Sequence, residues 1–154
     1  MTPARAIRFY GQASEHATVE WEWVDEQLRR AGTYWVTART TGNPHPRPVW
    51  GVWRSSRLFL SIGTPATRRT LSVDPAVTVH LDSGTEVVIV EGQVSGSSGD
   101  AEILAEYDGK YDWSYDLDEY GPLTRIVPST VLAWRTGGWA GRDGFQQSGR
   151  WELS

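Results

Sequence analysis

The sequence predicts a mainly β domain with flanking helices, built as an antiparallel barrel, and two observations favour this fold class. Runs rich in Val, Ile, Thr, Tyr, Phe and Trp follow one another across residues 34–94, and short clusters of Gly, Pro, Asn, Asp and Ser separate them. The length of 154 residues, 39% of them hydrophobic, suits one domain with one core. Closely spaced strands with turn clusters between them are typical of antiparallel barrels and sandwiches.

Two amphipathic helices are expected beside these runs. The first should run from Thr18 to Ala31, because apolar side chains recur on one face, arginines fill the last turn and Gly32 can cap it. The second should run from Asp100 to about Trp113, with Ser98 or Asp100 as its cap. The side chains expected on its buried face are Ile103, Leu104, Tyr107 and Tyr111.

Strands are expected at 33–40, 45–54, 57–62, 77–82, 86–95, 125–135 and 145–153. A short helix near 67–73 should interrupt them. The acidic segment 114–123 is interpreted as a surface excursion, and 136–144 (TGGWAGRDG) as a loop before the last strand. Residues 1–17 carry no pattern, so we expect a tail or strap there and a single domain over 18–154.

The composition excludes several classes of function. The net charge of -4 and the pI near 5.3 give no general attraction to nucleic acid or to an anionic membrane surface. The chain has no cysteine, which removes disulfides, thiolate metal sites and thiol catalysis. No apolar stretch reaches the length of a membrane span and the start lacks a secretion signal. We therefore expect a cytoplasmic protein that binds neither nucleic acid nor membrane.

The turn from Gly63 to Arg69 predicts an anion site. Thr64 can accept a hydrogen bond from a free backbone N–H, and Pro65 suits the first position of a helix. Arg68 and Arg69 follow within the first turns. The amino end of a helix with arginines beside it attracts phosphate. The nine tryptophans of the chain also suit the walls of a pocket for a flat ligand.

No standard catalytic signature occurs, since the chain lacks a Walker loop, a GxGxxG turn, a GxSxG elbow and an HExxH helix. Its three histidines, His16, His45 and His80, are too far apart to suggest metal ligation, and His80 is interpreted as a surface or hydrogen-bonded side chain. The acidic residues of 108–119 lack the pivot glycine of a calcium loop and are interpreted as a solvated face. We predict no metal site and assign no catalytic residue.

The order and spacing of short segments across most of the chain are more specific than any single motif. These segments are YWVTAR, RPVWGVW, LFLS, RRTLSVDP, VTVHL, EVVIVEG, YDGKYDW, VLAW and GRW. In this order they resemble the pyridoxamine 5'-phosphate oxidase-like superfamily of flavin-binding split barrels. The resemblance implies a six-stranded antiparallel split β-barrel with flanking helices, and a homodimer with two flavin sites at the subunit interface. It also implies FMN or the deazaflavin F420 as cofactor, used to oxidise or reduce small molecules.

The resemblance also assigns cofactor-binding positions. The residues that match the strand along the flavin ring are Arg47, Pro48, Val49 and Trp50. Those that match the strand end and turn beside the ring are Ser61, Ile62 and Gly63. Those that match the phosphate grip are Arg68 and Arg69, and those that match the partner-side wall are Trp134 and Arg150. We expect Trp50 and Trp134 to line the ligand cavity together.

The chain departs from the family at the phosphate grip. Members commonly carry an S-R-K-like run where this chain has Pro65, Ala66 and Thr67, so neutral side chains replace cationic ones. The Thr67 hydroxyl can donate to a phosphate there. It replaces a charge-assisted contact worth about 1.5 to 3 kcal/mol.

Two functions from different classes follow. The first is an oxidoreductase that binds FMN or F420 between subunits and transfers hydride to or from a small organic molecule. The acidic balance disfavours a basic groove for the polyglutamate tail of F420, which favours FMN. The second is a non-catalytic cofactor-binding or cofactor-free small-molecule-binding protein. A pyridoxal-type vitamer enzyme is disfavoured because the ending SGRWELS lacks the R-L-x-P pattern. Apolar runs at 49–53 and 87–90 also favour a homodimer.

Overall fold

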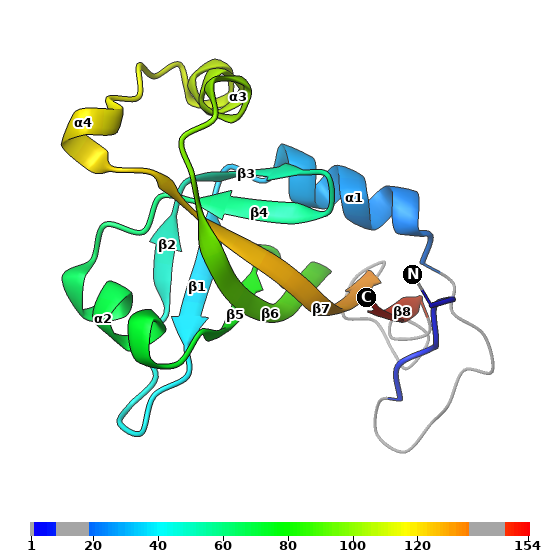
Figure 1. Cartoon of the computed structure of the whole chain (residues 1–154). Helices are drawn as coiled ribbons and strands as arrows, with labels where there is room; N and C mark the ends of the chain where they lie inside the picture. The colour runs from blue at the N-terminus through cyan, green and yellow to red at the C-terminus, as the bar shows by residue number, and fades with distance from the viewer. Residues whose placement is uncertain (1, 9–18, 136–146) are drawn as a thin grey trace.

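The protein folds as one curled antiparallel sheet with helices packed around it (Figure 1). The computed structural model describes residues 2–8, 19–135 and 147–154. Eight strands form the sheet in the order β2-β1-β5-β6-β7-β4-β3, and β8 pairs with β7 off this path. Among the described residues, no helix is long and apolar enough to cross a membrane.

The helices and strands have the following bounds. The amino-terminal half contains α1 (Trp21–Arg30), β1 (Tyr34–Ala38), β2 (Arg47–Val49), β3 (Gly51–Arg54), β4 (Arg57–Leu60), α2 (Pro65–Val73) and β5 (Ala76–His80). The carboxy-terminal half contains β6 (Glu86–Ser98), α3 (Ala101–Tyr111), α4 (Leu117–Tyr120), β7 (Leu123–Arg135) and β8 (Ser148–Glu152).

The two terminal strands of the sheet, β2 and β3, are joined by a single residue. Trp50 stands between them in the chain, although five strands separate them in the strand order. Because a one-residue link cannot bridge the width of an open sheet, the sheet must curl until its two ends meet. This link gives the half-open barrel its shape.

The long pair β6 and β7 supplies the curvature. Each strand has thirteen residues, and they pair from Glu86 opposite Arg135 to Ser98 opposite Leu123. Register shifts occur between Glu91 and Gly92 and again between Val94 and Ser97, where bulges bend and twist the strands. At Gly92 a Cβ would lie 2.4 Å from the carbonyl oxygen of Val127, so the close approach of the two backbones requires glycine.

Alternation along the strands separates a buried face from an outer face. The main core contains the inward side chains of β1, β5, β6 and β7 together with Val24 and Leu28 of α1. A smaller cluster lies under α3 and consists of Val52, Phe59, Ile103, Tyr107 and Leu123. The helix α3 therefore covers the outer side of β3 and β4, as the sequence pattern of its buried face predicts.

The predicted fold class is confirmed, but the number of strands is not six. The expected strand 45–54 is two strands, because β2 pairs with β1 whereas β3 pairs with β4. The carboxy-terminal strand β8 adds to β7 and completes the eight. The prediction of one continuous strand was wrong because strand-forming residues occur on both sides of Trp50, and the local sequence does not show that the two halves pair with different neighbours.

Several helix ends also differ from expectation. The helix α1 begins at Trp21, with Glu20 at its N-cap position, and Ala31 rather than Gly32 occupies its C-cap position. Neither Thr64 nor Asp100 makes a side-chain capping hydrogen bond. The segment interpreted as a surface excursion contains α4, whose N-cap Asp116 accepts hydrogen bonds from two backbone N–H groups. Most of the expected tail and the expected loop 136–144 lie outside the described residues.

Replacing Gly92 by Ala is expected to destabilise the fold by about 1 to 3 kcal/mol, because the new methyl group meets backbone that cannot move away. Gly109 is the matched control, since it lies in α3 with nothing within 4 Å of an added Cβ. Gly109→Ala is expected to stabilise the protein by up to about 1 kcal/mol through helix propensity. Urea unfolding of both variants measures the difference, and equal effects would contradict the close approach at Gly92.

Candidate functional site

The exposed residue Trp50 stands at the meeting point of the two sheet ends. Its side chain is 42% exposed, and its carbonyl oxygen accepts a hydrogen bond from Ser61 N–H at 2.9 Å. The next residue, Gly51, leaves no room for a side chain, since a Cβ would lie 2.4 Å from Leu60 Cδ2 and 2.6 Å from the Phe59 carbonyl oxygen. The backbone after Trp50 is therefore pressed directly against β4.

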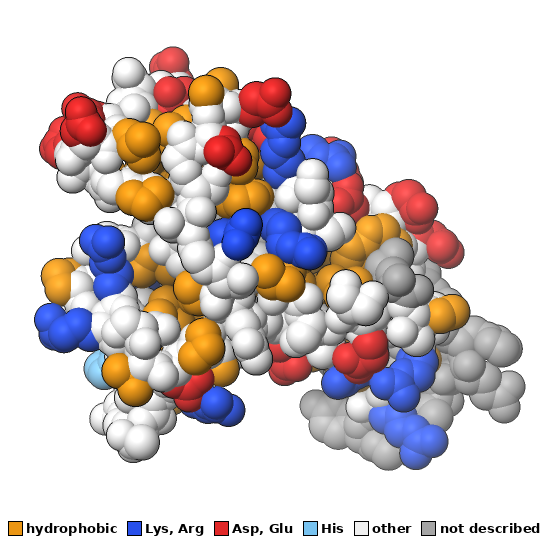
Figure 2. All heavy atoms as spheres, viewed as in Figure 1, with side chains coloured by type: hydrophobic (Ala, Val, Ile, Leu, Met, Phe, Trp, Pro, Cys, Tyr) orange, Lys and Arg blue, Asp and Glu red, His pale blue; other side chains and the backbone are white. Residues whose placement is uncertain are grey.

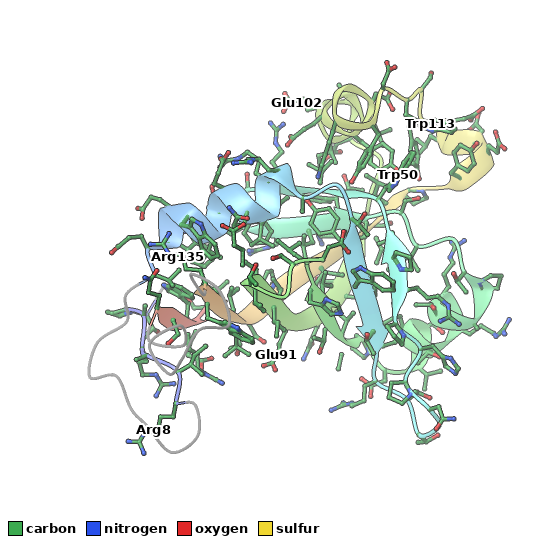
Figure 3. The ribbon with its side chains drawn as sticks, turned by 180° about the vertical axis from the view of Figure 1, so that it is seen from behind. Arg8, Trp50, Glu91, Glu102, Trp113 and Arg135 are labelled. Carbon is green, nitrogen blue, oxygen red and sulfur yellow. The ribbon has the colours of Figure 1, made fainter. Side chains whose placement is uncertain are left out.

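An aromatic cluster surrounds Trp50 and joins it to α3 and α4. Its members, linked by successive ring contacts, are Trp50, Tyr107, Tyr111, Trp113, Tyr115 and Tyr120. Trp50 stacks on Tyr111 with the rings nearly parallel and 4.5 Å apart, and Trp113 stands at 82° to it. Figure 3 shows Trp50 and Trp113 close to each other near α3. The cluster thus presents a half-exposed aromatic surface at the end of the barrel.

Burial within this cluster favours neutral phenols. Desolvation raises the pKa of Tyr107 to about 12, while a side-chain hydrogen bond with Ser61 opposes the shift. Desolvation likewise raises the pKa of Tyr111 and of Tyr115. Ser61, which the resemblance places beside a cofactor ring, is therefore connected to the phenols of this cluster.

Lys110, the only lysine of the chain, lies half-buried beside the cluster. Its Nζ donates to the carbonyl oxygen of Gly51 at 2.8 Å and to the hydroxyl of Tyr34 at 2.9 Å. The Tyr34 hydroxyl in turn donates to the carbonyl oxygen of Leu28 at 2.6 Å, at the end of α1. Burial lowers the pKa of Lys110 to about 8, although Glu106 acts in the opposite direction.

A pocket of about 100 Å³ lies between α2 and the β1–β2 connection, and we call it the α2 pocket. The residues that line it are Ala38, Thr40, His45, Arg47, Thr64, Ala66, Thr67 and Thr70. The lining therefore combines several hydroxyl groups with one guanidinium and one imidazole. This combination, at the amino end of a helix, suits a small oxyanion.

Thr67 gives the α2 pocket its most specific feature. The residue is only 7% exposed, and its hydroxyl has no hydrogen-bond partner within the described ranges 2–8, 19–135 and 147–154. Buried hydroxyls are normally paired, because an unpaired one loses its hydration without compensation. The cap residue Thr64 makes no side-chain bond that would occupy the helix end. The donors of the pocket therefore fit the phosphate of a phosphorylated cofactor.

The structure brings only part of the predicted site together. Arg47 and Thr67 line the same pocket, and Pro48, Val49 and Trp50 lead directly from it to the aromatic cluster. The connection from β4 to α2 contains the other assigned residues of this region, Ser61, Ile62 and Gly63. Ile62 is buried in the core, whereas Gly63 is exposed.

The predicted arginine grip lies outside the pocket lining. Arg68 and Arg69 are both exposed on α2, and neither is among the residues that form the α2 pocket. The charge of Arg68 instead acts on the phenol of Tyr115, which lies between α3 and α4. The cation that the structure places in the pocket is Arg47, with His45 beside it.

Trp134 and Arg150 lie on a different part of the molecule, the outer face of the sheet. We define this face by a row of paired residues, Trp35, His80, Ile89, Leu132 and Arg150, on β1, β5, β6, β7 and β8. Trp134 follows Leu132 on the same face of β7. Figure 3 shows its neighbour Arg135 at the opposite end of the molecule from Trp50. Within one chain, the two tryptophans do not share a cavity.

His80 is hydrogen-bonded, as predicted. Its Nδ1 lies 2.9 Å from the carbonyl oxygen of Leu81, and its ring is nearly parallel to that of Trp35. The described residues contain no cluster of side chains that could hold a metal ion. Asp116, one of the acidic residues that the sequence indicates as a solvated face, serves as the cap of α4.

Sequence reasoning assigned no role in the site to several residues of this region: Thr40, His45, Lys110, Tyr111 and Trp113. For the last three, the single lysine within the aromatic segment YDGKYDW was an available signal. The β1–β2 connection offered none, because its residues are distant in sequence from the helix that they face.

No protein-family model matches the chain. No curated protein matches it either. Among solved structures, 64 chains are similar to this protein in structure.

Three of these structures are representative. An F420 reductase aligns with a TM-score of 0.56 at 18% identity, over 70% of this chain and 94% of its own. A candidate pyridoxamine 5'-phosphate oxidase from Listeria innocua aligns with a TM-score of 0.57 at 18% identity, over 73% and 95%. An FAD-binding protein from Mesorhizobium loti aligns with a TM-score of 0.55 at 15% identity, over 87% and 94%. The chain therefore has the split-barrel fold of pyridoxamine 5'-phosphate oxidase-like proteins.

Proposed function

We propose that the chain binds a phosphorylated flavin, FMN rather than F420, and acts as an oxidoreductase on a small organic molecule. The observation that carries this proposal is the α2 pocket, which is lined by both Arg47 and the buried residue Thr67, whose hydroxyl has no partner among the described residues. Three residues further along the chain, Trp50 presents an exposed indole. A small pocket lined by hydroxyl groups and a guanidinium, with an aromatic wall close to it along the chain, suits a ligand with one anionic end and one flat end.

The residues of the site would divide the work of binding. Arg47 and Thr67 would hold the phosphate, the first by a charge-assisted contact and the second by its hydroxyl. Trp50, held against Tyr111, would limit one side of the ring. A bound flavin supplies the hydride chemistry, so the protein needs no catalytic motif of its own.

The surroundings of Trp50 favour FMN over F420. Acidic side chains gather over α3 and α4 (Figure 2), among them Glu102, Asp112, Asp116, Asp118 and Glu119. A polyglutamate tail that left the site past this lobe would meet like charge, which is unfavourable. FMN has no such tail.

We further propose that two copies associate through the outer face of the sheet. This face combines half-buried apolar side chains such as Ile89 and Leu132 with both signs of charge at Arg150 and Glu152. Such a surface can meet a second copy of itself about a two-fold axis. In this arrangement Trp134 and Arg150 of a second copy would complete the site that one chain leaves open.

A non-catalytic binding protein is the second candidate. The departure at Thr67, which removes a cation from the phosphate grip, is the observation that favours it. Such a protein would bind a small anion in the α2 pocket and no flavin.

The first prediction from this proposal concerns the cofactor itself. Purified protein mixed with FMN is expected to show the flavin absorption bands after removal of free ligand, because the pocket and aromatic wall retain it. F420 is expected to bind more weakly, and the same separation followed by its own absorption band measures this. Retention of neither compound, with inorganic phosphate still bound, would support the second candidate and contradict the first.

The second prediction concerns the phosphate contacts. Arg47→Ala is expected to raise the dissociation constant of FMN roughly tenfold to hundredfold, the equivalent of a contact of about 1.5 to 3 kcal/mol. Thr67→Val keeps the shape and is expected to cost roughly two- to tenfold. Riboflavin, which lacks the phosphate, should bind almost equally to all variants. Fluorescence titration measures both ligands.

A double variant, Arg68→Ala with Arg69→Ala, is the comparison for this experiment. Because both side chains are exposed and outside the pocket lining, the double variant should lose less affinity for FMN than Arg47→Ala. A larger loss would assign the phosphate to the exposed side of α2 instead.

The third prediction concerns the oligomer. Light scattering is expected to give twice the chain mass of 17.2 kDa. Ile89→Glu places a charge on the outer face and is expected to yield a folded monomer. Val73→Glu is the matched control, because Val73 is 87% exposed on α2, away from this face. A wild-type monomer at micromolar concentration would rule out the proposed association.

A further inference from the structure

The backbone of Gly51, the residue after Trp50, is in contact with other parts of the molecule on two sides. On one side, Gly51 is paired with Leu60 of β4 with no space for a Cβ. On the other side β3 has no neighbour among the described strands, because it ends their order in the sheet. Two side chains of α3 occupy this open edge: the hydroxyl of Tyr111 accepts from Gly51 N–H at 2.9 Å, and Lys110 donates to the Gly51 carbonyl oxygen at 2.8 Å.

The same two side chains are also connected to the indole of Trp50. Tyr111 stacks on it at 4.5 Å, and Nζ of Lys110 lies 5.3 Å from the centre of the Tyr111 ring. Lys110 therefore contacts both the backbone that follows the indole and the ring that supports it. A change in the charge or position of this amino group can therefore affect Trp50 in two ways, through the backbone of Gly51 or through the ring of Tyr111.

We propose that Lys110 is a positioning residue for the aromatic wall at Trp50: its ammonium group, bonded to Gly51 and Tyr34, sets the orientation of the indole. Lys110 does not itself line the α2 pocket. It acts through Gly51 and Tyr111. The inference deepens the proposed function, because it names a residue that regulates the same site, but its test requires no ligand.

The charge of Lys110 makes this positioning dependent on pH. The groups that face its Nζ are the phenol of Tyr34 on β1, and the phenol of Tyr111 and the carboxylate of Glu106 on α3. The carboxylate of Glu106 also forms a salt bridge with Arg54, with 3.1 Å between Arg54 Nη1 and Glu106 Oε2. Burial lowers the pKa of Lys110 to about 8 and raises that of both phenols, so the amine loses its proton first as pH rises. Loss of the proton removes the attraction of the ammonium for the two rings and weakens its bond to Gly51.

The single lysine allows a direct experiment. Protein with ¹³C at the lysine ε position gives one signal, from Lys110, whose titration reports the protonation of this amine. In the same sample, ¹⁵N-labelled indoles report the nine tryptophans, and Trp50→Phe identifies the signal of Trp50. The Trp50 signal is expected to move with the same midpoint as the Lys110 signal, near pH 8, while most other indole signals stay constant.

Substitutions separate positioning from a purely structural role. Lys110→Met keeps the apolar stem and is expected to shift the Trp50 signal and abolish its titration. Lys110→Arg keeps the charge and the donors, and is expected to restore the position without the pH dependence. Tyr111→Phe keeps the stacked ring but removes the bond to Gly51 N–H, so it should retain the titration. Arg30→Met, at an exposed cation of α1, is the neutral control.

The result that would overturn the inference is a Trp50 signal that does not respond to the titration of Lys110 in the wild-type protein. If Lys110→Met does not fold, this wild-type titration and Lys110→Arg decide the question. Because neither measurement includes a cofactor, a failure of FMN to bind would contradict the proposed function and leave this test valid. If FMN does bind, Lys110→Met is expected to weaken it about tenfold, with riboflavin weakened equally, since the ring contact rather than the phosphate contact is lost.

Discussion

The link from β2 to β3 through one residue is the constraint on which the shape of the molecule depends. Consecutive segments of the chain occupy the two ends of the strand order, so the sheet between them must curl until the ends meet. The bulges in β6 and β7 supply the bend that this requires, and Gly92 permits the contact of backbones where the bend is tight. The inner side of the curled sheet then encloses the main core, which α1 closes.

The same constraint creates both halves of the candidate site. Strand β2 carries Arg47 toward the amino end of α2, and the residue that ends the strand, Trp50, is left outside regular pairing. An exposed indole at a strand break needs support, which α3 provides through Tyr111 and Lys110. The pocket and the aromatic wall are therefore products of barrel closure rather than additions to a finished barrel.

Much of the fold could be predicted from the sequence because it depends on local patterns. Alternating apolar residues indicate β1, β5 and β6, and the apolar face of α3 indicates which side packs on the sheet. The division at Trp50 could not be predicted, because strand-forming residues such as valine and tryptophan occur in both halves of that run and do not specify which strand each half pairs with. The short helix α4 was missed because the residue that indicates its start is the N-cap Asp116. Several acidic residues surround Asp116, and the sequence does not distinguish the one that caps a helix.

The site was predicted less completely, for a physical reason. The α2 pocket combines residues from the β1–β2 connection with residues of α2, and only tertiary packing brings these together. Arg47 was assigned to the ring through a resemblance, yet in the structure it lines the pocket with Thr67. The role of Lys110 depends on an unpaired strand edge, which no local pattern in the sequence reports.

The structure of the two strands that end the sheet, β2 and β3, also affects the tendency of the protein to aggregate. An exposed strand edge offers unpaired N–H and C=O groups to any other extended chain. Here β3 has the edge groups of Gly51 bonded to α3, while β2 is only three residues long and has Pro48, without an N–H, at its centre. Both ends of the strand order therefore offer few free backbone groups to which another strand could bond. At the β3 edge, the side chains that disfavour the addition of another strand are the same ones that hold the aromatic wall.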